Sequence, residues 1–227
     1  MKFDIITLFP DYFTSPLNES LLKKAIENKI ITIQTLNLRD FSHLPNNQVD
    51  DSPYGGGAGM VLRADVLAAA VKATKSNGGT VVLPDPSGLK LNQKLVRELA
   101  NKKHLIFICG RYEGIDQRFR ENYVDLEVSV GDYILNGGEV ATLTIIEAIS
   151  RLIPGVIGNT ESLKSESFNE INGELLLEYP QYTRPENFEN KSVPKVLLSG
   201  NHQEIAKWRQ EEALKKTRKL RPDLLNR

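Results

Sequence analysis

The sequence predicts an α/β fold built on a parallel β-sheet, because short strand-like runs alternate with helical patterns over its first two thirds. The strand-like runs are rich in Ile, Val and Phe and span Lys2–Leu8, Ile30–Leu36, Thr80–Leu83, His104–Cys109 and Val124–Val130. The helical segments repeat apolar residues at helical spacing and span Glu19–Asn28, Ala64–Lys75, Asn92–Asn101 and Gly138–Leu152. Such alternation is typical of a parallel sheet with helices packed on its faces.

A change of pattern after Pro154 predicts a second, smaller domain. Residues 159–173 are polar and lack a clear period, which is typical of a flexible linker. A strong helix begins at Asn201. We therefore expect a first domain over residues 1–158 and a small, mainly helical domain over residues 174–227.

The composition indicates an ordinary globular protein, since 40% of the 227 residues are hydrophobic and 26% are charged. A net charge of zero argues against a protein that coats nucleic acid indiscriminately. The single cysteine, Cys109, cannot form an internal disulfide, and no segment has the apolar length of a signal peptide or a membrane span. We expect a cytoplasmic protein without a membrane partner.

Three glycine-rich loops are the candidate binding features. SPYGGGAGM spans Ser52–Met60, while CGRYEGID at Cys109–Asp116 and VGDYILNGGE at Val130–Glu139 each follow a predicted strand directly. Ligands of open α/β sheets bind beyond the carboxyl ends of the strands, so two adjacent strands with such loops predict a ligand cleft. Tight turns explain either loop alone, but they explain the pair poorly.

Several functional classes lack their signatures. No G-x-G-x-x-G follows the first strand, no Lys-Ser/Thr ending completes a P-loop, and no G-x-S-x-G elbow is present. His43, His104 and His202 lie far apart along the chain, and Cys109 has no neighbouring cysteine. We therefore expect no metal-binding set of these residues.

Seven segments together resemble one known family, in order, from Phe3 to Arg209: FDIITLFP, VDDSPYGGGAGM, CGRYEGID, SVGDYILNGGE, SRLIPGVIGN, YPQYTRP and VLLSGNHQEIAKWR. The chain resembles the bacterial tRNA (guanine-N(1))-methyltransferases. These enzymes transfer a methyl group from S-adenosylmethionine to N1 of the guanosine at tRNA position 37, on the 3′ side of the anticodon. The resemblance implies the SPOUT class, which has a deep trefoil knot in its α/β domain. It also implies a homodimer whose subunits share each active site.

The resemblance places the cofactor site on three loops at strand ends. Backbone groups there would contact the adenine edge, and Tyr112, Tyr133, Ile134 and Leu135 would form apolar walls. The implied residues are Leu83, Pro86, Gly110, Tyr112, Glu113, Gly114, Val130, Gly131, Asp132, Tyr133, Ile134, Leu135 and Gly138.

The reaction needs two further groups, because guanine N1 carries a proton at neutral pH. A carboxylate can remove that proton, and a cation near the guanine carbonyl oxygen can stabilise the charge that develops there. The resemblance implies Glu166 as the base and Arg151 as the cation, although the family usually has Asp where this chain has Glu166. Glu170 and Glu113 are the alternative bases. By pattern alone, Arg151 is a cation at a helix carboxyl end and Glu166 a solvated charge.

The substrate implied by the resemblance is tRNA. Arg184 in YTRP and His202 in SGNH are the candidate contacts to phosphates or bases. Five of the seven residues of Lys215–Arg221 are basic, which fits either a solvated helix face or a phosphate-contacting surface. The family also allows an assisting Mg²⁺, for which the sequence shows no dedicated site.

Three other functions remain as alternatives. One is a SPOUT methyltransferase for a different RNA nucleotide, which the YTRP and LLSGNH segments disfavour. A second is an RNA-binding module without catalysis, which the departures from the family at Glu166 and Asp85 leave open. The departure at Asp85 arises because PDPSG at Pro84–Gly88 replaces the family's usual S-P-Q-G, which places Asp85 near the cofactor. The third is a nucleotide-binding oxidoreductase, which is disfavoured because the sequence lacks the G-x-G-x-x-G motif of dinucleotide-binding proteins.

Overall fold

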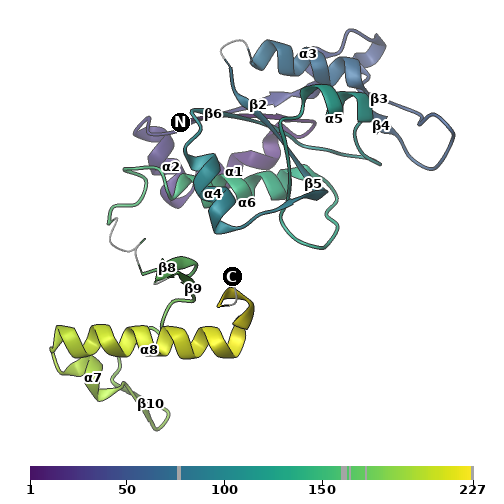
Figure 1. Ribbon diagram of the computed structural model, residues 1–227. Coiled ribbons are helices and arrows are strands. Elements are labelled where there is room, and N and C mark those ends of the chain that lie inside the picture. Colours follow the sequence, from purple (N-terminus) through teal and green to yellow (C-terminus); the bar gives the residue numbers. More distant parts are fainter. Residues whose placement is uncertain (76–77, 160–162, 164, 172, 226–227) are drawn as a thin grey trace. The chain divides into compact units, whose positions relative to one another are not determined.

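The chain forms two compact units, Met1–Gly158 and Asn159–Arg227. Figure 1 shows the computed structural model, which describes residues 1–75, 78–159, 163, 165–171 and 173–225. Within these ranges no helix is both long enough and apolar enough to cross a membrane.

A five-stranded parallel sheet is the centre of the first unit and confirms the predicted α/β fold. Its strand order is β2-β1-β6-β5-β7. The strands span Thr32–Asn37 (β2), Lys2–Thr7 (β1), His104–Ile108 (β6), Thr80–Lys90 (β5) and Leu126–Ser129 (β7). All five overlap the runs that the sequence marked as strands, and all but β5 have nearly the predicted bounds.

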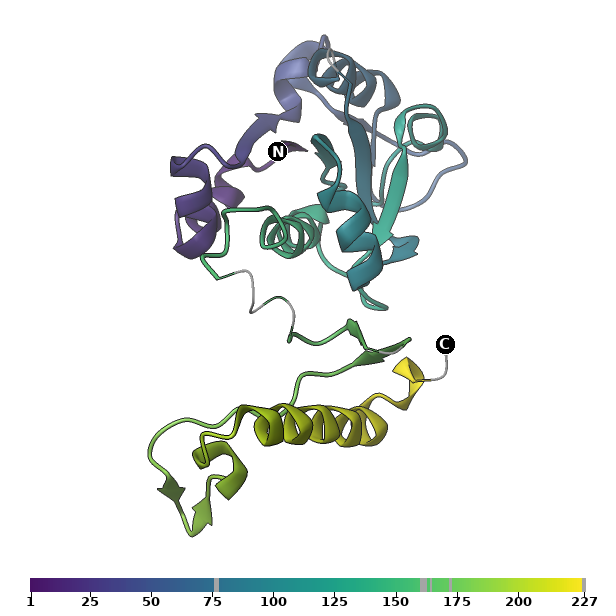
Figure 2. The ribbon, with the colours of Figure 1, turned by 60° about the vertical axis from the view of Figure 1, so that its left-hand side comes forward.

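The two faces of the sheet bury separate apolar cores, because successive strand residues point to opposite sides. Phe3 and Ile5 of β1 belong to one core, and Ile6 to the other. The first core takes side chains from α2 (Ser20–Glu27), α4 (Gln93–Ala100) and α6 (Gly138–Ser150). The second core takes side chains from α3 (Ala64–Thr74) and α5 (Gln117–Tyr123). Figures 1 and 2 show α3 and α5 together on one side of the sheet, and α4 with α6 on the other.

Strand β5 continues well past the predicted end at Leu83, as far as Lys90. Its pairing with β6 covers only Thr80–Val82, whereas it pairs with β7 again at Leu89 and Lys90 after a shift in register. Gly88 lies in this shifted part. A Cβ there would lie 2.4 Å from backbone atoms of the neighbouring strand, so only glycine fits.

Short elements complete the first unit. They are 3₁₀ turns at Pro10–Phe13, Leu38–Phe41 and Pro45–Asn47, helix α1 (Thr14–Leu17), and the paired strands β3 (Asp50–Asp51) and β4 (Val61–Leu62).

The second unit is organised around the long helix α8 (His202–Leu220). The Asn201 side chain caps its start by accepting from the backbone N–H groups of Gln203 and Glu204. The other elements are β8 (Asn169–Ile171), β9 (Glu174–Leu176), β10 (Asn187–Phe188), β11 (Lys191–Ser192), α7 (Lys195–Leu198) and a 3₁₀ turn at Pro222–Leu224.

Part of the segment predicted as a linker has regular structure, since β8 pairs with β9 in an antiparallel hairpin. The hairpin is attached to α8 through Thr217, which is fully buried. The Thr217 hydroxyl accepts from Leu177 N–H at 2.8 Å and donates to Ala213 C=O at 2.7 Å. This connection fixes the chain that leads to Glu166 against the helix.

Candidate active site

Three loops meet at the carboxyl edge of the sheet, because β6, β5 and β7 are parallel neighbours. They follow the first part of β5, the end of β6 and the end of β7, and they contain nearly all the predicted cofactor residues. Strand β5 lies between β6 and β7, so the two strands that carry CGRYEGID and VGDYILNGGE are not direct neighbours. The expectation of adjacent strands was wrong, yet the loops still share one edge.

The loop after β6 packs directly against the start of α6. Gly138 N–H donates to Gly110 C=O at 3.0 Å. A Cβ on Gly138 would lie 2.9 Å from Cys109 Cα and 3.0 Å from Gly110 N. The absence of a side chain at Gly138 therefore permits this contact between the two predicted cofactor loops.

A buried ion pair holds these loops together. Glu139 is 1% exposed, and its Oε2 lies 2.9 Å from Arg111 Nη2. Its Oε1 accepts from Arg111 Nε at 3.1 Å and from the Thr7 hydroxyl at 2.9 Å. Arg111 also donates to Asn136 C=O at 3.3 Å and lies over the Phe9 ring, 4.5 Å from its centroid.

Sequence reasoning did not assign a role to this network. Its members Thr7, Arg111 and Glu139 fall in three of the family-like segments, FDIITLFP, CGRYEGID and VGDYILNGGE. Their presence in these segments was the available sign that the three residues act together. The structure shows that they form one network of hydrogen bonds and an ion pair.

Cys109 lies beneath the same loops and is buried. Burial, followed by the charge of Glu139, raises the pKa of its thiol. The Sγ atom is 3.4 Å from the Thr142 hydroxyl. The thiol therefore stays neutral at physiological pH and does not serve as a nucleophile.

Apolar side chains are exposed on the loops after β6 and β7. Tyr112, Tyr133, Ile134 and Leu135 are 49%, 56%, 82% and 37% exposed. Tyr112 adopts a left-handed conformation with φ 58°, which is uncommon for a residue with a side chain. These are the four residues expected to form apolar walls.

The loop SPYGGGAGM joins the same end of the sheet. Glu113 N–H donates to Met60 C=O at 3.0 Å, and Leu62 N–H donates to Gly114 C=O at 2.9 Å. A Cβ on Gly59 would lie 2.4 Å from Glu113 Cγ. Glu113, one of the alternative bases, is thus packed against a glycine loop.

The remaining cofactor candidates lie at the same edge in different environments. Leu83 is buried in the second core and Val130 packs against the first, so a ligand would meet their backbone. Pro86 is exposed, and Gly131 has φ 157°. The Asp132 carboxylate pairs with Lys90 Nζ at 2.9 Å.

Asp85, the departure in the β5 loop, faces the protein's own polar groups. Its Oδ1 accepts from Ser87 N–H at 2.9 Å and lies 3.3 Å from Arg120 Nη2. Burial alone would raise the pKa of Asp85, but the hydrogen bonds from Ser87 and the charge of Arg120 outweigh it and lower the pKa below its usual value. Its charge is therefore balanced by Arg120 of α5 and by the hydrogen bonds from Ser87.

The two predicted catalytic residues belong to different units. Arg151 follows α6 in the first unit and is exposed. Glu166 lies in the second unit and lines a pocket of about 440 Å³ with Tyr179, Arg209 and side chains of β8, β9 and α8. The next residues are fixed to β9, because Phe168 N–H donates to Leu176 C=O at 2.8 Å and the Ser167 hydroxyl accepts from Glu178 N–H at 3.0 Å.

The two predicted substrate residues also lie in the second unit. Arg184 lines a second pocket of about 400 Å³. His202 is the first residue of α8, is exposed, and lines neither pocket. The structure thus brings Arg184, but not His202, into a pocket beside the one that holds Glu166.

No group of three or more His, Cys, Asp or Glu side chains suited to a metal ion occurs in the described part of the chain.

The fold is that of an α/β protein with a parallel sheet, and its candidate ligand site lies at the carboxyl ends of the strands. A family model described as tRNA (Guanine-1)-methyltransferase TrmD matches residues 1–227. The tRNA (guanine-N(1)-)-methyltransferase of Carboxydothermus hydrogenoformans is 54% identical over 225 residues, which cover 99% of this chain and 87% of the relative. The enzymes of the same name from Clostridium tetani and Dictyoglomus turgidum are 51% and 48% identical, and the matches cover 100% of this chain and 92% and 91% of the relatives. The chain belongs to the tRNA (guanine-N(1)-)-methyltransferase family.

Proposed function

We propose that this protein transfers the methyl group of S-adenosylmethionine to N1 of the guanosine at position 37 of tRNA, on the 3′ side of the anticodon. The family match over residues 1–227 is the observation that carries the proposal. The loop edge of the first unit and the Glu166 pocket of the second supply the two kinds of group that this reaction needs.

The residues at the sheet edge fit the methyl donor. Tyr112, Tyr133, Ile134 and Leu135 present exposed apolar surface that suits an adenine ring, and Gly114 leaves open space beside the backbone. When bound, S-adenosylmethionine supplies an electrophilic methyl group, so the protein needs no nucleophile of its own. This agrees with the neutral, buried thiol of Cys109.

The protein's chemical task is to remove the proton from guanine N1. We assign that step to the Glu166 carboxylate, which would accept the proton as the nitrogen attacks the methyl group. The Arg151 guanidinium would lie at the guanine carbonyl oxygen and stabilise its developing negative charge. Glu166 is one methylene longer than the usual Asp, and its attachment to β9 through the two following residues restricts where the longer side chain can reach.

We infer a homodimer with a shared site and a trefoil knot at the loop edge, as in the SPOUT class. In this arrangement the Glu166 pocket of one chain serves the methyl donor held by the other. Light scattering at assay concentration should give twice the mass of the 25.5 kDa chain, and a monomer would contradict the shared site. A crystal structure that traces the chain without a threaded crossing near the loop after β7 would contradict the knot.

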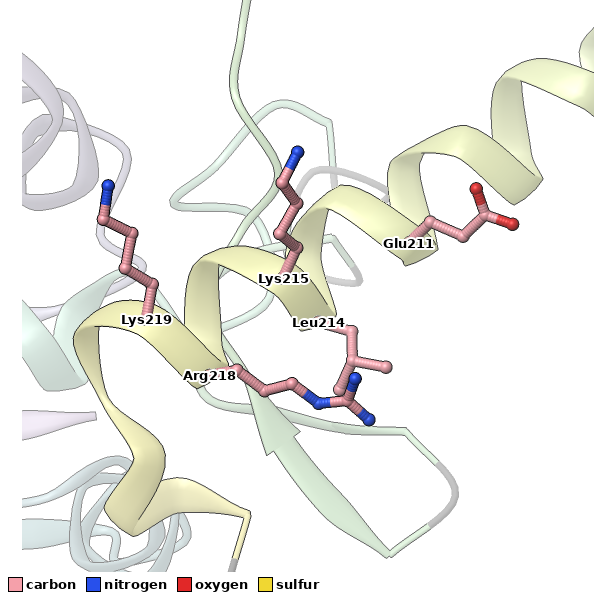
Figure 3. Close-up of a pocket in the computed structure, with 5 residues that line it drawn as sticks. All are labelled: Glu211, Leu214, Lys215, Arg218 and Lys219. Carbon is pink, nitrogen blue, oxygen red and sulfur yellow. The ribbon is translucent and has the colours of Figure 1, made fainter.

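The basic face of α8 is the proposed phosphate-contacting surface. Lys215, Arg218 and Lys219 border a shallow depression together with Glu211 and Leu214. Figure 3 shows Lys215 and Lys219 extending from the helix in the same direction. Replacing these three cations with Ala should reduce the slope of log affinity against log salt by about 2–3, since each phosphate contact contributes about 0.7–0.9. An unchanged slope would remove the surface from the tRNA interface.

Nucleoside mapping tests the proposed function. The protein is incubated with labelled S-adenosylmethionine and unmodified tRNA that carries guanosine at the target and on both sides of it. We expect 1-methylguanosine at the target position alone. Ribose methylation, or transfer only to ribosomal RNA, would indicate another SPOUT activity, and no transfer in the presence of tRNA binding would indicate a non-catalytic module. The need for Mg²⁺ is read from the same assay with added EDTA, and undiminished turnover would exclude it.

A further inference from the structure

Two pockets of the second unit share one wall, formed by Tyr179 and Arg209. The first pocket, of about 440 Å³, contains Glu166, and the second, of about 400 Å³, contains Arg184. Tyr179 and Arg209 line both of them. The Arg209 guanidinium carbon lies over the Tyr179 ring, 4.8 Å from its centroid.

The shared wall has the chemistry of a stacking platform. Unpaired bases bind to proteins by stacking on aromatic rings and on the planar guanidinium of arginine. Arg209 is exposed and Tyr179 is half-buried, so faces of both groups remain open to a ligand. Within the described residues, the Arg209 guanidinium contacts the ring of Tyr179 through its face. This contact leaves the N–H groups of Arg209 available to a phosphate or a base.

The second pocket adds further groups suited to a nucleotide. Tyr182 is 49% exposed, and its ring centroid is 6.3 Å from that of Trp208. Arg184 supplies a second cation, while Leu197 and Ile205 supply apolar surface. Rings, guanidinium groups and an apolar floor together suit a base and its phosphate, whereas a hydrophobic peptide would leave two arginines buried without partners.

We propose that Tyr179 and Arg209 hold an unpaired nucleotide adjacent to the target guanosine, with its base in the Arg184 pocket, while the target guanine enters the Glu166 pocket. The inference rests on the proposed function, because the ligand is the anticodon loop of the tRNA substrate. Holding the neighbour fixes the position of the target base relative to the carboxylate. Tyr179 and Arg209 are then binding residues for the nucleotide next to the reaction and take no part in proton removal.

A thermodynamic cycle between protein and RNA tests this assignment. Binding of tRNA is measured by fluorescence anisotropy for wild type, Tyr179→Ala and Arg209→Ala. Each is measured with intact tRNA and with two tRNAs that lack the base on either side of the target. Each variant should weaken binding of intact tRNA about 5–150-fold, which corresponds to about 1–3 kcal/mol for a stacked base. With one of the two abasic tRNAs, wild type and variants should bind equally.

Matched controls separate stacking from structural damage. Tyr179→Phe keeps the aromatic face and should bind as wild type, whereas Arg209→Lys keeps the charge but not the plane and should recover only part of the affinity. Lys207→Ala removes a 79% exposed cation from the same helix outside both pockets and should change binding less than twofold. Affinity for S-adenosylmethionine should stay unchanged in every variant. If Tyr179→Ala does not fold, Arg209→Ala and Arg209→Lys carry the test.

The proposal is overturned if both alanine variants bind intact tRNA within twofold of wild type. It is also overturned if each variant lowers the affinity for both abasic tRNAs by as much as it lowers the affinity for intact tRNA. The anisotropy readout does not require turnover. If wild type binds tRNA but forms no 1-methylguanosine, the proposed function fails while the cycle still reports whether the nucleotide site exists.

Discussion

The loop edge of the first unit and the Glu166 pocket of the second differ in how their polar groups are held. At the loop edge, Glu139 is almost completely buried and is bound by Arg111 and Thr7. In the pocket, Arg209 is exposed and Glu166 is half-buried. The edge that we assign to the methyl donor is thus built into the core, whereas the pocket that we assign to tRNA is open. Stability should therefore depend on the first, and substrate affinity and proton removal on the second.

Removing the buried carboxylate should give the largest loss of stability. Glu139→Ala leaves Arg111 without its ion partner, and breaking a buried pair costs about 3–5 kcal/mol. Urea unfolding should show this decrease in the free energy of unfolding. Glu147→Ala, on the exposed side of the same helix, is the control and should change it by less than about 0.5 kcal/mol. Equal effects of the two variants would mean that the network contributes little.

A methyl group at the contact between loops should have a smaller effect. Gly138→Ala forces a Cβ to within 2.9 Å of Cys109 Cα, and overpacking of this kind costs about 1–3 kcal/mol. The displaced loops should also bind S-adenosylmethionine more weakly, as calorimetry would measure. Gly158→Ala is the control, because a Cβ there meets no atom within 4 Å. Normal stability and cofactor affinity in Gly138→Ala would show that the loops can separate without consequence.

The smallest effect is expected at Asp85, and it should depend on pH. The folded state lowers the pKa of Asp85 below its usual value of 3.8, so the stabilisation is complete above that value and is lost as pH falls through the folded pKa. Asp85→Asn should cost about 0.2–1 kcal/mol at pH 7, and the difference from wild type should shrink below about pH 3.8. Urea titrations at both pH values measure this. A difference independent of pH would assign it to packing instead of charge.

The strands and main helices could be predicted because their apolar residues repeat locally. The order of the strands could not, since the insertion of β5 between β6 and β7 depends on packing between distant segments. Nor could the extension of β5 through Pro84 and Pro86, because proline normally ends a strand. It is tolerated here because β5 pairs with β6 only as far as Val82, so the later residues need no donor on that side.

The candidate site was predictable to a similar extent. Motif resemblance proposed the loops and Glu166 as site residues, but the burial of Glu139 against Arg111 is a tertiary fact that no local pattern shows. Helix α5 was missed because QRFRENY buries a single residue, Phe119. The shared wall of Tyr179 and Arg209 was missed because these residues are 30 positions apart, Arg209 on α8 and Tyr179 just after β9.

The Glu166→Gln variant tests most directly whether the loop edge binds the methyl donor while the Glu166 pocket removes the proton. Single-turnover methylation of tRNA and calorimetric binding of S-adenosylmethionine are measured on the same preparation, with Glu170→Gln as the matched control on β8. The account predicts that Glu166→Gln lowers the methylation rate by about 10²–10⁴-fold, as expected for loss of a general base, and leaves cofactor affinity unchanged. Glu170→Gln should behave as wild type. Near-normal turnover in Glu166→Gln, or loss of cofactor binding with it, would contradict the account.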